Sequence, residues 1–160
     1  MSIEGRGMRS ERTRMDENVI IKITTSNFNI SSEIARLRSK SDGAIVSFVG
    51  AVRGGGGAKY LEIEIYDEMA LRQMRLLAKQ ARAKFKVGAI TIIHRKGKLA
   101  VGENIVLIAV AAPHRKEAFD ACEWLIDELK KVVPIWKSEN MSEGGVDVGA
   151  PVSAAKKTKR

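Results

Sequence analysis

The sequence contains little cysteine, proline or histidine: Cys122 is the only cysteine, and three prolines and two histidines occur among 160 residues. A single cysteine excludes an internal disulfide and CxxC redox chemistry, and it is typical of a protein from a reducing compartment. Neither histidine has a cysteine, a carboxylate or the other histidine at ligand spacing. We therefore predict no metal site and no cofactor.

Aromatic side chains are also scarce, at 5% of residues, although the net charge of +9 suggests a nucleic-acid partner. Residues 1–16 contribute +1 and residues 150–160 contribute +4, which leaves +4 for the rest of the chain. Such basic ends favour solvated tails over a nucleic-acid-binding arm. No base-stacking motif is visible, and this further disfavours RNA binding.

Long apolar runs are absent as well. The longest, Ile105 to Pro113, has nine residues, whereas a transmembrane helix needs about 20. The N-terminal region is charged and lacks the apolar core of a signal peptide. These features predict a soluble, cytoplasmic protein.

The length and the 44% hydrophobic content are sufficient for one core, so we predict a single domain over residues 17–149. Residues 1–16 are predicted to be a disordered tail or a tag, because Ile3-Glu4-Gly5-Arg6 resembles a protease-cleavage site and Met8 and Met15 are alternative starts. Residues 150–160 are predicted to form a basic, disordered tail.

Hydrophobic periodicity predicts strands that alternate with helices. The predicted strands cover residues 19–23, 44–52, 60–66, 89–94 and 104–112, and the predicted helices cover residues 29–38, 67–85 and 114–133. The strand at 44–52 is expected to be largely buried. This order indicates an α+β domain in which helices pack on a mixed sheet.

The two longer predicted helices each carry an apolar stripe. Met69 and Met74 belong to the stripe of the first helix and are interpreted as core residues. Phe119 and Cys122 belong to the stripe of the second. A buried position favours a packing role for Cys122 over a reactive thiol.

The four glycines at 54–57 suggest a phosphate-binding loop, but no Lys-Ser or Lys-Thr pair follows them. A strand rather than a helix comes next, so a Walker loop is excluded. A mobile flap beside Arg53 and a plain connecting loop both remain open.

Each histidine is followed by an arginine. The pair His94-Arg95 is interpreted as a strand end that enters a turn, in preference to a substrate contact. The pair His114-Arg115 begins the last predicted helix, where unpaired backbone N–H groups and the helix dipole favour an anion. An arginine there adds a bidentate donor for phosphate or carboxylate.

Lys130 and Lys137 are separated by Pro134, so helical spacing does not relate them. Lys130 falls on the last helical turn beside the apolar stripe, and Lys137 follows Trp136, whose indole is expected to anchor the segment. A lysine held against apolar surface can act as an acid, a base or a nucleophile.

Four motifs follow one another between about Val19 and Glu139. They are Gly43 to Arg53 (GAIVSFVGAVR), His94-Arg95-Lys96-Gly97 with Gly102-Glu103, His114-Arg115 with Ala118-Phe119, and Asp127 and Lys130 with Pro134-Ile135-Trp136-Lys137-Ser138-Glu139. In order and spacing they resemble the family of large, catalytic subunits of molybdopterin synthase.

The resemblance implies an α/β hammerhead-type fold and a homodimer of large subunits. A small ubiquitin-like subunit would dock on each to give a heterotetramer, and it would carry a C-terminal Gly-Gly thiocarboxylate as the sulfur donor. The implied substrate is cyclic pyranopterin monophosphate. Insertion of two sulfurs would convert it to molybdopterin, in the biosynthesis of the molybdenum cofactor.

The resemblance also implies residue roles. Lys130 and Lys137 would be the catalytic lysines near the thiocarboxylate and would contact the substrate, and Ser138 and Glu139 would complete this part of the site. The residues implied to line the pocket or bind the anionic pterin are Phe48, the Ala51 and Val52 backbone, Arg53, His114 and Arg115.

After Glu139 the sequence departs from the family, because no arginine occurs before Arg160. In many members an arginine there contributes to the neighbouring subunit's site, and only a tail lysine such as Lys156 offers a loose replacement. An alternative hypothesis is a non-catalytic anion- or pterin-binding subunit of the same fold. Lys130 discriminates against it, since binding alone does not need a lysine against apolar surface.

Overall fold

The computed structural model describes residues 18–55, 57–133, 135–141 and 145–148, with residues 58, 135–141 and 145–148 described by their backbone. The predicted tails at 1–16 and 150–160 lie outside the described residues. The elements, in chain order, are β1 Val19–Thr24, α2 Ile30–Arg36, β2 Ala44–Ala51, β3 Ala58–Ile65, α3 Asp67–Lys84, β4 Ile90–Arg95, β5 Gly97–Ala100, β6 Asn104–Ala112, α4 Arg115–Val132, β7 Ile135–Met141 and β8 Gly145–Val148.

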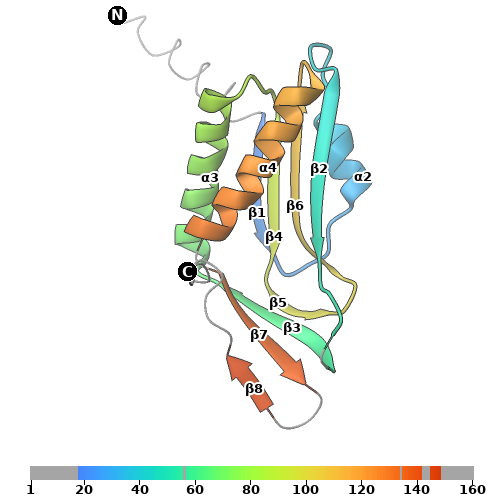
Figure 1. Cartoon of the computed structure of the whole chain (residues 1–160), viewed down its shortest axis with the longest axis vertical. Coiled ribbons are helices and arrows are strands. Elements are labelled where there is room, and N and C mark those ends of the chain that lie inside the picture. The colour runs from blue at the N-terminus through green and yellow to red at the C-terminus, as the bar shows by residue number, and fades with distance from the viewer. Residues whose placement is uncertain (1–17, 56, 134, 142–144, 149–160) are drawn as a thin grey trace, which may run out of the picture.

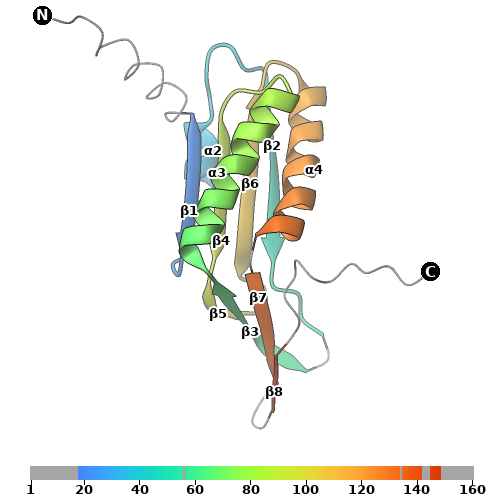
Figure 2. The same cartoon turned by 90° about the vertical axis from the view of Figure 1, so that its left-hand side faces the viewer.

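The main sheet has the strand order β1-β4-β6-β2. β1 and β4 are parallel, whereas β4, β6 and β2 pair in antiparallel fashion, so the sheet is mixed as predicted. Figures 1 and 2 show α3 and α4 side by side on one face of this sheet. Ile92 and Ile108 belong to the core under these two helices, while their neighbours Ile93 and Leu107 point to the opposite face.

The opposite face is covered by α2, which contributes to a smaller apolar cluster around Leu37. This short helix begins at its predicted cap, because the Asn29 side chain accepts a hydrogen bond from the Ser32 backbone N–H at 2.9 Å. The fold class is therefore confirmed as a single α+β domain with helices packed on a mixed sheet.

A second, antiparallel sheet extends below the first in Figure 1, with the strand order β5-β3-β7-β8. Sequence patterns predicted only β3 of these strands. β5 was not predicted as a strand, and it begins at Gly97, whose φ of +95° is typical of a turn. It becomes a strand because β3 pairs with it on one side and with β7 on the other.

Three burial predictions were wrong. Met69 is 50% exposed and Phe119 is 61% exposed, because each lies beside the line of residues that meets the sheet. β2 is half-buried rather than buried, since it is the edge strand of the main sheet. None of the helices in the described part of the chain is long and apolar enough to cross a membrane.

Candidate functional site

A pocket of about 200 Å³ lies where the C-terminal end of α4 meets the main sheet. Its walls come from the end of β2, the end of β4, the start of β6 and the last turn of α4. The lining residues are Phe48, Gly50, Ala51, His94, Ile105, Val106, Ile126, Leu129, Lys130 and Val133.

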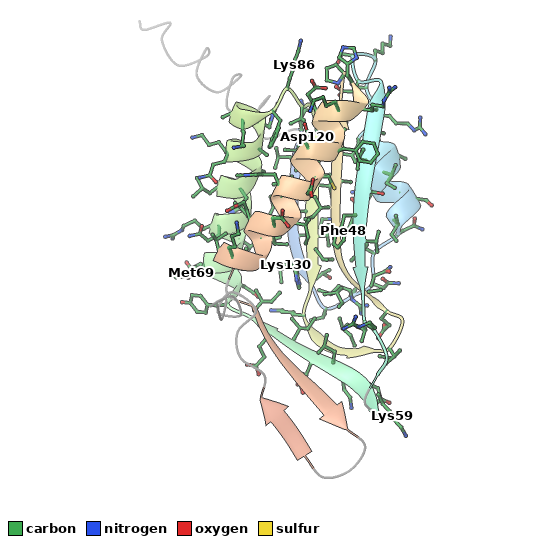
Figure 3. The ribbon with its side chains drawn as sticks, viewed as in Figure 1. Phe48, Lys59, Met69, Lys86, Asp120 and Lys130 are labelled. Carbon is green, nitrogen blue, oxygen red and sulfur yellow. The ribbon has the colours of Figure 1, made fainter. Side chains whose placement is uncertain are left out.

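Three of the residues implied by the resemblance meet at this pocket: Phe48, Ala51 and Lys130. Phe48 is half-buried, and Lys130 is exposed on the last turn of α4. Figure 3 shows Lys130 at the lower end of α4 and Phe48 on the neighbouring strand. Because the other walls are mainly apolar, Lys130 lies beside apolar surface, as predicted.

His94 also lines the pocket and is 4% exposed. Its Nδ1 lies 2.8 Å from the Arg95 carbonyl oxygen, so in the neutral ring Nδ1 is the protonated nitrogen. The sequence placed this residue correctly near a strand end, but it did not predict that His94 lines the pocket. The available signal was strand alternation, which puts His94 on the same face as Ile92, towards α4.

Arg53 lies two residues beyond the end of β2 and is exposed. The intervening residue, Val52, is 7% exposed and has both backbone polar groups paired with the segment before β6. Ala51, Val52 and Arg53 therefore form a continuous edge. Ala51 lines the pocket, and Arg53 lies two residues further along the chain. Gly57, in the adjoining glycine run, has a φ of +79°, which favours glycine.

His114 and Arg115 lie at the opposite end of the main sheet. His114 occupies the N-cap position of α4 without a side-chain capping hydrogen bond, and Arg115 is the first helical residue; both are exposed. Gly43, just before β2, packs so closely here that an added Cβ would meet the Pro113 carbonyl oxygen at 2.8 Å. Since α4 runs without a break from Arg115 to Val132, sixteen steps of about 1.5 Å place His114 roughly 24 Å from Lys130.

The remaining predicted residues, Lys137, Ser138 and Glu139, lie in β7, where the structure describes the backbone. Lys137 pairs with Ile63 of β3, and Glu139 pairs with Leu61. Their side chains lie outside the described part, so their proximity to the pocket stays a prediction.

Cys122 faces the core beneath α4, as predicted, and is 4% exposed. Burial raises the pKa of its thiol to about 11, and a hydrogen bond with the Phe48 backbone opposes this shift only in part. The thiol therefore stays protonated at neutral pH, whereas sulfur carriers react as thiolates. These properties favour packing over sulfur transfer.

We expect Cys122→Ser to retain activity per folded molecule and to lower the free energy of unfolding by about 1–3 kcal/mol, because it buries a hydroxyl. Thermal melting and turnover check this result. Cys122→Ala is the matched control, since it removes the sulfur without adding a polar group. Loss of activity with unchanged melting in both variants would instead identify Cys122 as a sulfur carrier.

Comparisons with known proteins identify the family. The family model described as "MoaE protein" matches residues 23–132. The molybdopterin synthase catalytic subunit of Pyrococcus abyssi is 46% identical over 121 residues, which cover 74% of this chain and 82% of that protein. The crystal structure of molybdopterin synthase from Staphylococcus aureus is 34% identical with a TM-score of 0.72, over 76% of this chain and 91% of that one.

A structure from Helicobacter pylori, described as a complex of subunits 1 and 2 of molybdopterin-converting factor, shares the fold. Its TM-score is 0.64 at 21% identity, and the match covers 88% of this chain and 92% of that one. The family match and the identity to the P. abyssi protein extend over most of this chain. The chain therefore belongs to the MoaE protein family, the catalytic subunits of molybdopterin synthase, and is an enzyme subunit of molybdenum cofactor biosynthesis.

Proposed function

We propose that the chain inserts two sulfurs into cyclic pyranopterin monophosphate to form molybdopterin. The donor is the C-terminal thiocarboxylate of a small ubiquitin-like subunit. Its sulfur bonds to the pterin, and water then cleaves the bond between that sulfur and the acyl carbon, which leaves the small subunit with a carboxylate. The observation that carries this proposal is the pocket in which Lys130, Phe48 and Ala51 meet, in a chain whose relatives are named for this activity.

The state of the cysteine supports an external sulfur donor. Cys122 is the only cysteine in the sequence, and it is buried and protonated. A sulfur transfer reaction still needs a nucleophilic sulfur. A partner's thiocarboxylate meets this need, and the word "subunit" in the relative's name also implies a partner chain.

The proposed roles follow from charge and position. Lys130 acts on the thiocarboxylate or the acyl carbon at the pocket, as an acid, a base or a nucleophile. Lys137, with Ser138 and Glu139, completes this side of the site. Arg53 binds the anionic groups of the pterin.

We further propose that each active site is shared between two large subunits. One small pterin cannot contact both His114 and Lys130 if they lie roughly 24 Å apart on one helix. In a two-fold dimer, the His114-Arg115 end of one chain can approach the pocket of the other, which gives two identical sites. With one small subunit on each large subunit the assembly is a heterotetramer. We place the reaction in the cytoplasm, where a reducing environment maintains a free thiol such as that of Cys122.

Reconstitution tests the proposed function. The purified chain is incubated with a thiocarboxylated small subunit and cyclic pyranopterin monophosphate, and molybdopterin formation is measured. The control is the same small subunit with an ordinary C-terminal carboxylate, which has no sulfur to donate. Binding of both components without any product would favour a non-catalytic pterin-binding subunit.

A further inference from the structure

Arg95 is a buried cation outside the pocket. Only 5% of the residue is exposed, yet its guanidinium donates to a Glu103 carboxylate oxygen at 3.3 Å, to the Asn104 carbonyl at 3.2 Å and to the Thr25 carbonyl at 3.3 Å. A buried charge is costly unless its partners are well placed. Arg95 therefore holds the end of β1 and the start of β6 in a fixed relation.

Glu103 uses both of its carboxylate oxygens as acceptors. Oε1 accepts from Arg95, and Oε2 accepts from the Ala100 backbone N–H at 2.6 Å. The Ala100 hydrogen bond is the main cause that lowers the pKa of Glu103 below its ordinary value of 4.5, with Arg95 contributing. The carboxylate is thus ionised at neutral pH and holds the turn between β5 and β6.

Two backbone hydrogen bonds join this turn to Val52, one through its N–H group and one through its carbonyl. The Val52 N–H donates to the Glu103 carbonyl at 2.9 Å, and the Gly102 N–H donates to the Val52 carbonyl at 2.8 Å. Val52 is the single residue between Ala51, which lines the pocket, and Arg53. The conformation of the turn therefore sets the direction in which the backbone leaves the pocket towards Arg53.

We propose that Arg95 and Glu103 are positioning residues for substrate binding: through the turn and Val52, they hold Arg53 at the edge of the pocket. This proposal rests on the proposed function, since it assigns the anionic pterin to Arg53. Neither positioning residue needs to touch the substrate. They act by determining the position of the Arg53 guanidinium relative to the pocket.

Glu103→Gln is a sharp test because an amide side chain has one oxygen acceptor where the carboxylate has two. Gln must lose either Arg95 or the Ala100 N–H. We expect the KM for the cyclic pterin to rise roughly tenfold with kcat within about twofold, the pattern of lost uniform binding.

The matched control is Asp67→Asn. Asp67 is a second carboxylate, and it forms an ion pair with Lys96, the residue that follows Arg95. Asp67 Oδ2 accepts from Lys96 at 2.6 Å, while Oδ1 has no hydrogen-bond partner. An amide can therefore keep this contact, and the bridge leads to α3 rather than to the turn. We expect its KM to match that of the wild-type chain.

Two further measurements separate positioning from general destabilisation. In an Arg53→Ala background, Glu103→Gln should change KM by less than about twofold, because the residue it acts through is gone. Amide hydrogen exchange at Val52 and Gly102 should accelerate in Glu103→Gln and stay unchanged in Asp67→Asn. If Glu103→Gln does not fold, Arg95→Lys carries the same tests, since it keeps the charge and loses the multiple contacts.

An unchanged KM in Glu103→Gln, or a tenfold effect that persists without Arg53, would overturn the positioning role. Absence of any turnover by the wild-type chain with a competent donor would instead overturn the proposed function. The exchange measurement does not depend on activity. Unaltered exchange at Val52 and Gly102 would exclude the structural link by itself.

Discussion

Lys130→Ala is expected to slow sulfur transfer by about 10²- to 10⁴-fold, the usual effect of removing one positioned acid-base group. Lys130 lines the pocket from the last turn of α4, while its exposed side chain contributes little to the core. The melting temperature should therefore change little. Lys137→Ala is expected to have an effect of the same order, because Lys137 is proposed to act in the same site.

Lys131→Ala is the matched control for this prediction. Lys131 is the next residue on the same helix, is also exposed, and makes a surface ion pair with Glu128 at 3.1 Å. Such pairs contribute little to stability, so both turnover and melting should remain near those of the wild-type chain. Near-normal turnover in both Lys130→Ala and Lys137→Ala would contradict the proposed chemistry.

Mixed dimers are expected to recover activity that neither parent has. One parent carries His114→Ala with Arg115→Ala, and the other carries Lys130→Ala with Lys137→Ala. If each site combines the helix start of one chain with the pocket of its partner, a hybrid dimer has one intact site and one doubly damaged site. Turnover should rise from near zero to about half the wild-type value per hybrid dimer, the fraction that one intact site of two gives.

The complementation experiment needs verified subunit exchange, for example with two affinity tags of different kinds that isolate the hybrid. The control mixes Lys130→Ala chains with Lys137→Ala chains, whose altered residues are proposed to lie on the same side of one site. That hybrid should stay inactive, because each of its sites still lacks one lysine. An inactive hybrid of the first kind would indicate that a site is built within a single chain.

Local sequence was sufficient for the regular elements whose patterns are strong. β1, β6 and the three helices lie close to their predicted ranges, because apolar periodicity and a cap such as Asn29 act over a few residues. The motif order also identified the family, which the comparisons confirm. The burial of Cys122 followed from its place on the apolar stripe of α4.

Strand pairing and packing between segments distant in the sequence determined the features that local patterns did not predict. β5 and β7 are strands because β3 lies between them, and no local pattern of Gly97–Ala100 indicates that neighbour. The exposure of Met69 and Phe119 depended on which line of each helix faces the sheet, which a broad apolar stripe does not specify. The register of β2 with β6 determined that Ala51 reaches the pocket while Gly43 lies at the far end.

The sequence by itself thus determined the family and the fold class. Only the tertiary structure brought Phe48, Ala51, His94 and Lys130 to one pocket and left His114 at the other end of α4. The physical reason is the sequence separation over which each interaction acts. Periodicity and capping act between residues three or four positions apart, whereas a site depends on strand register and helix docking between segments distant in the chain.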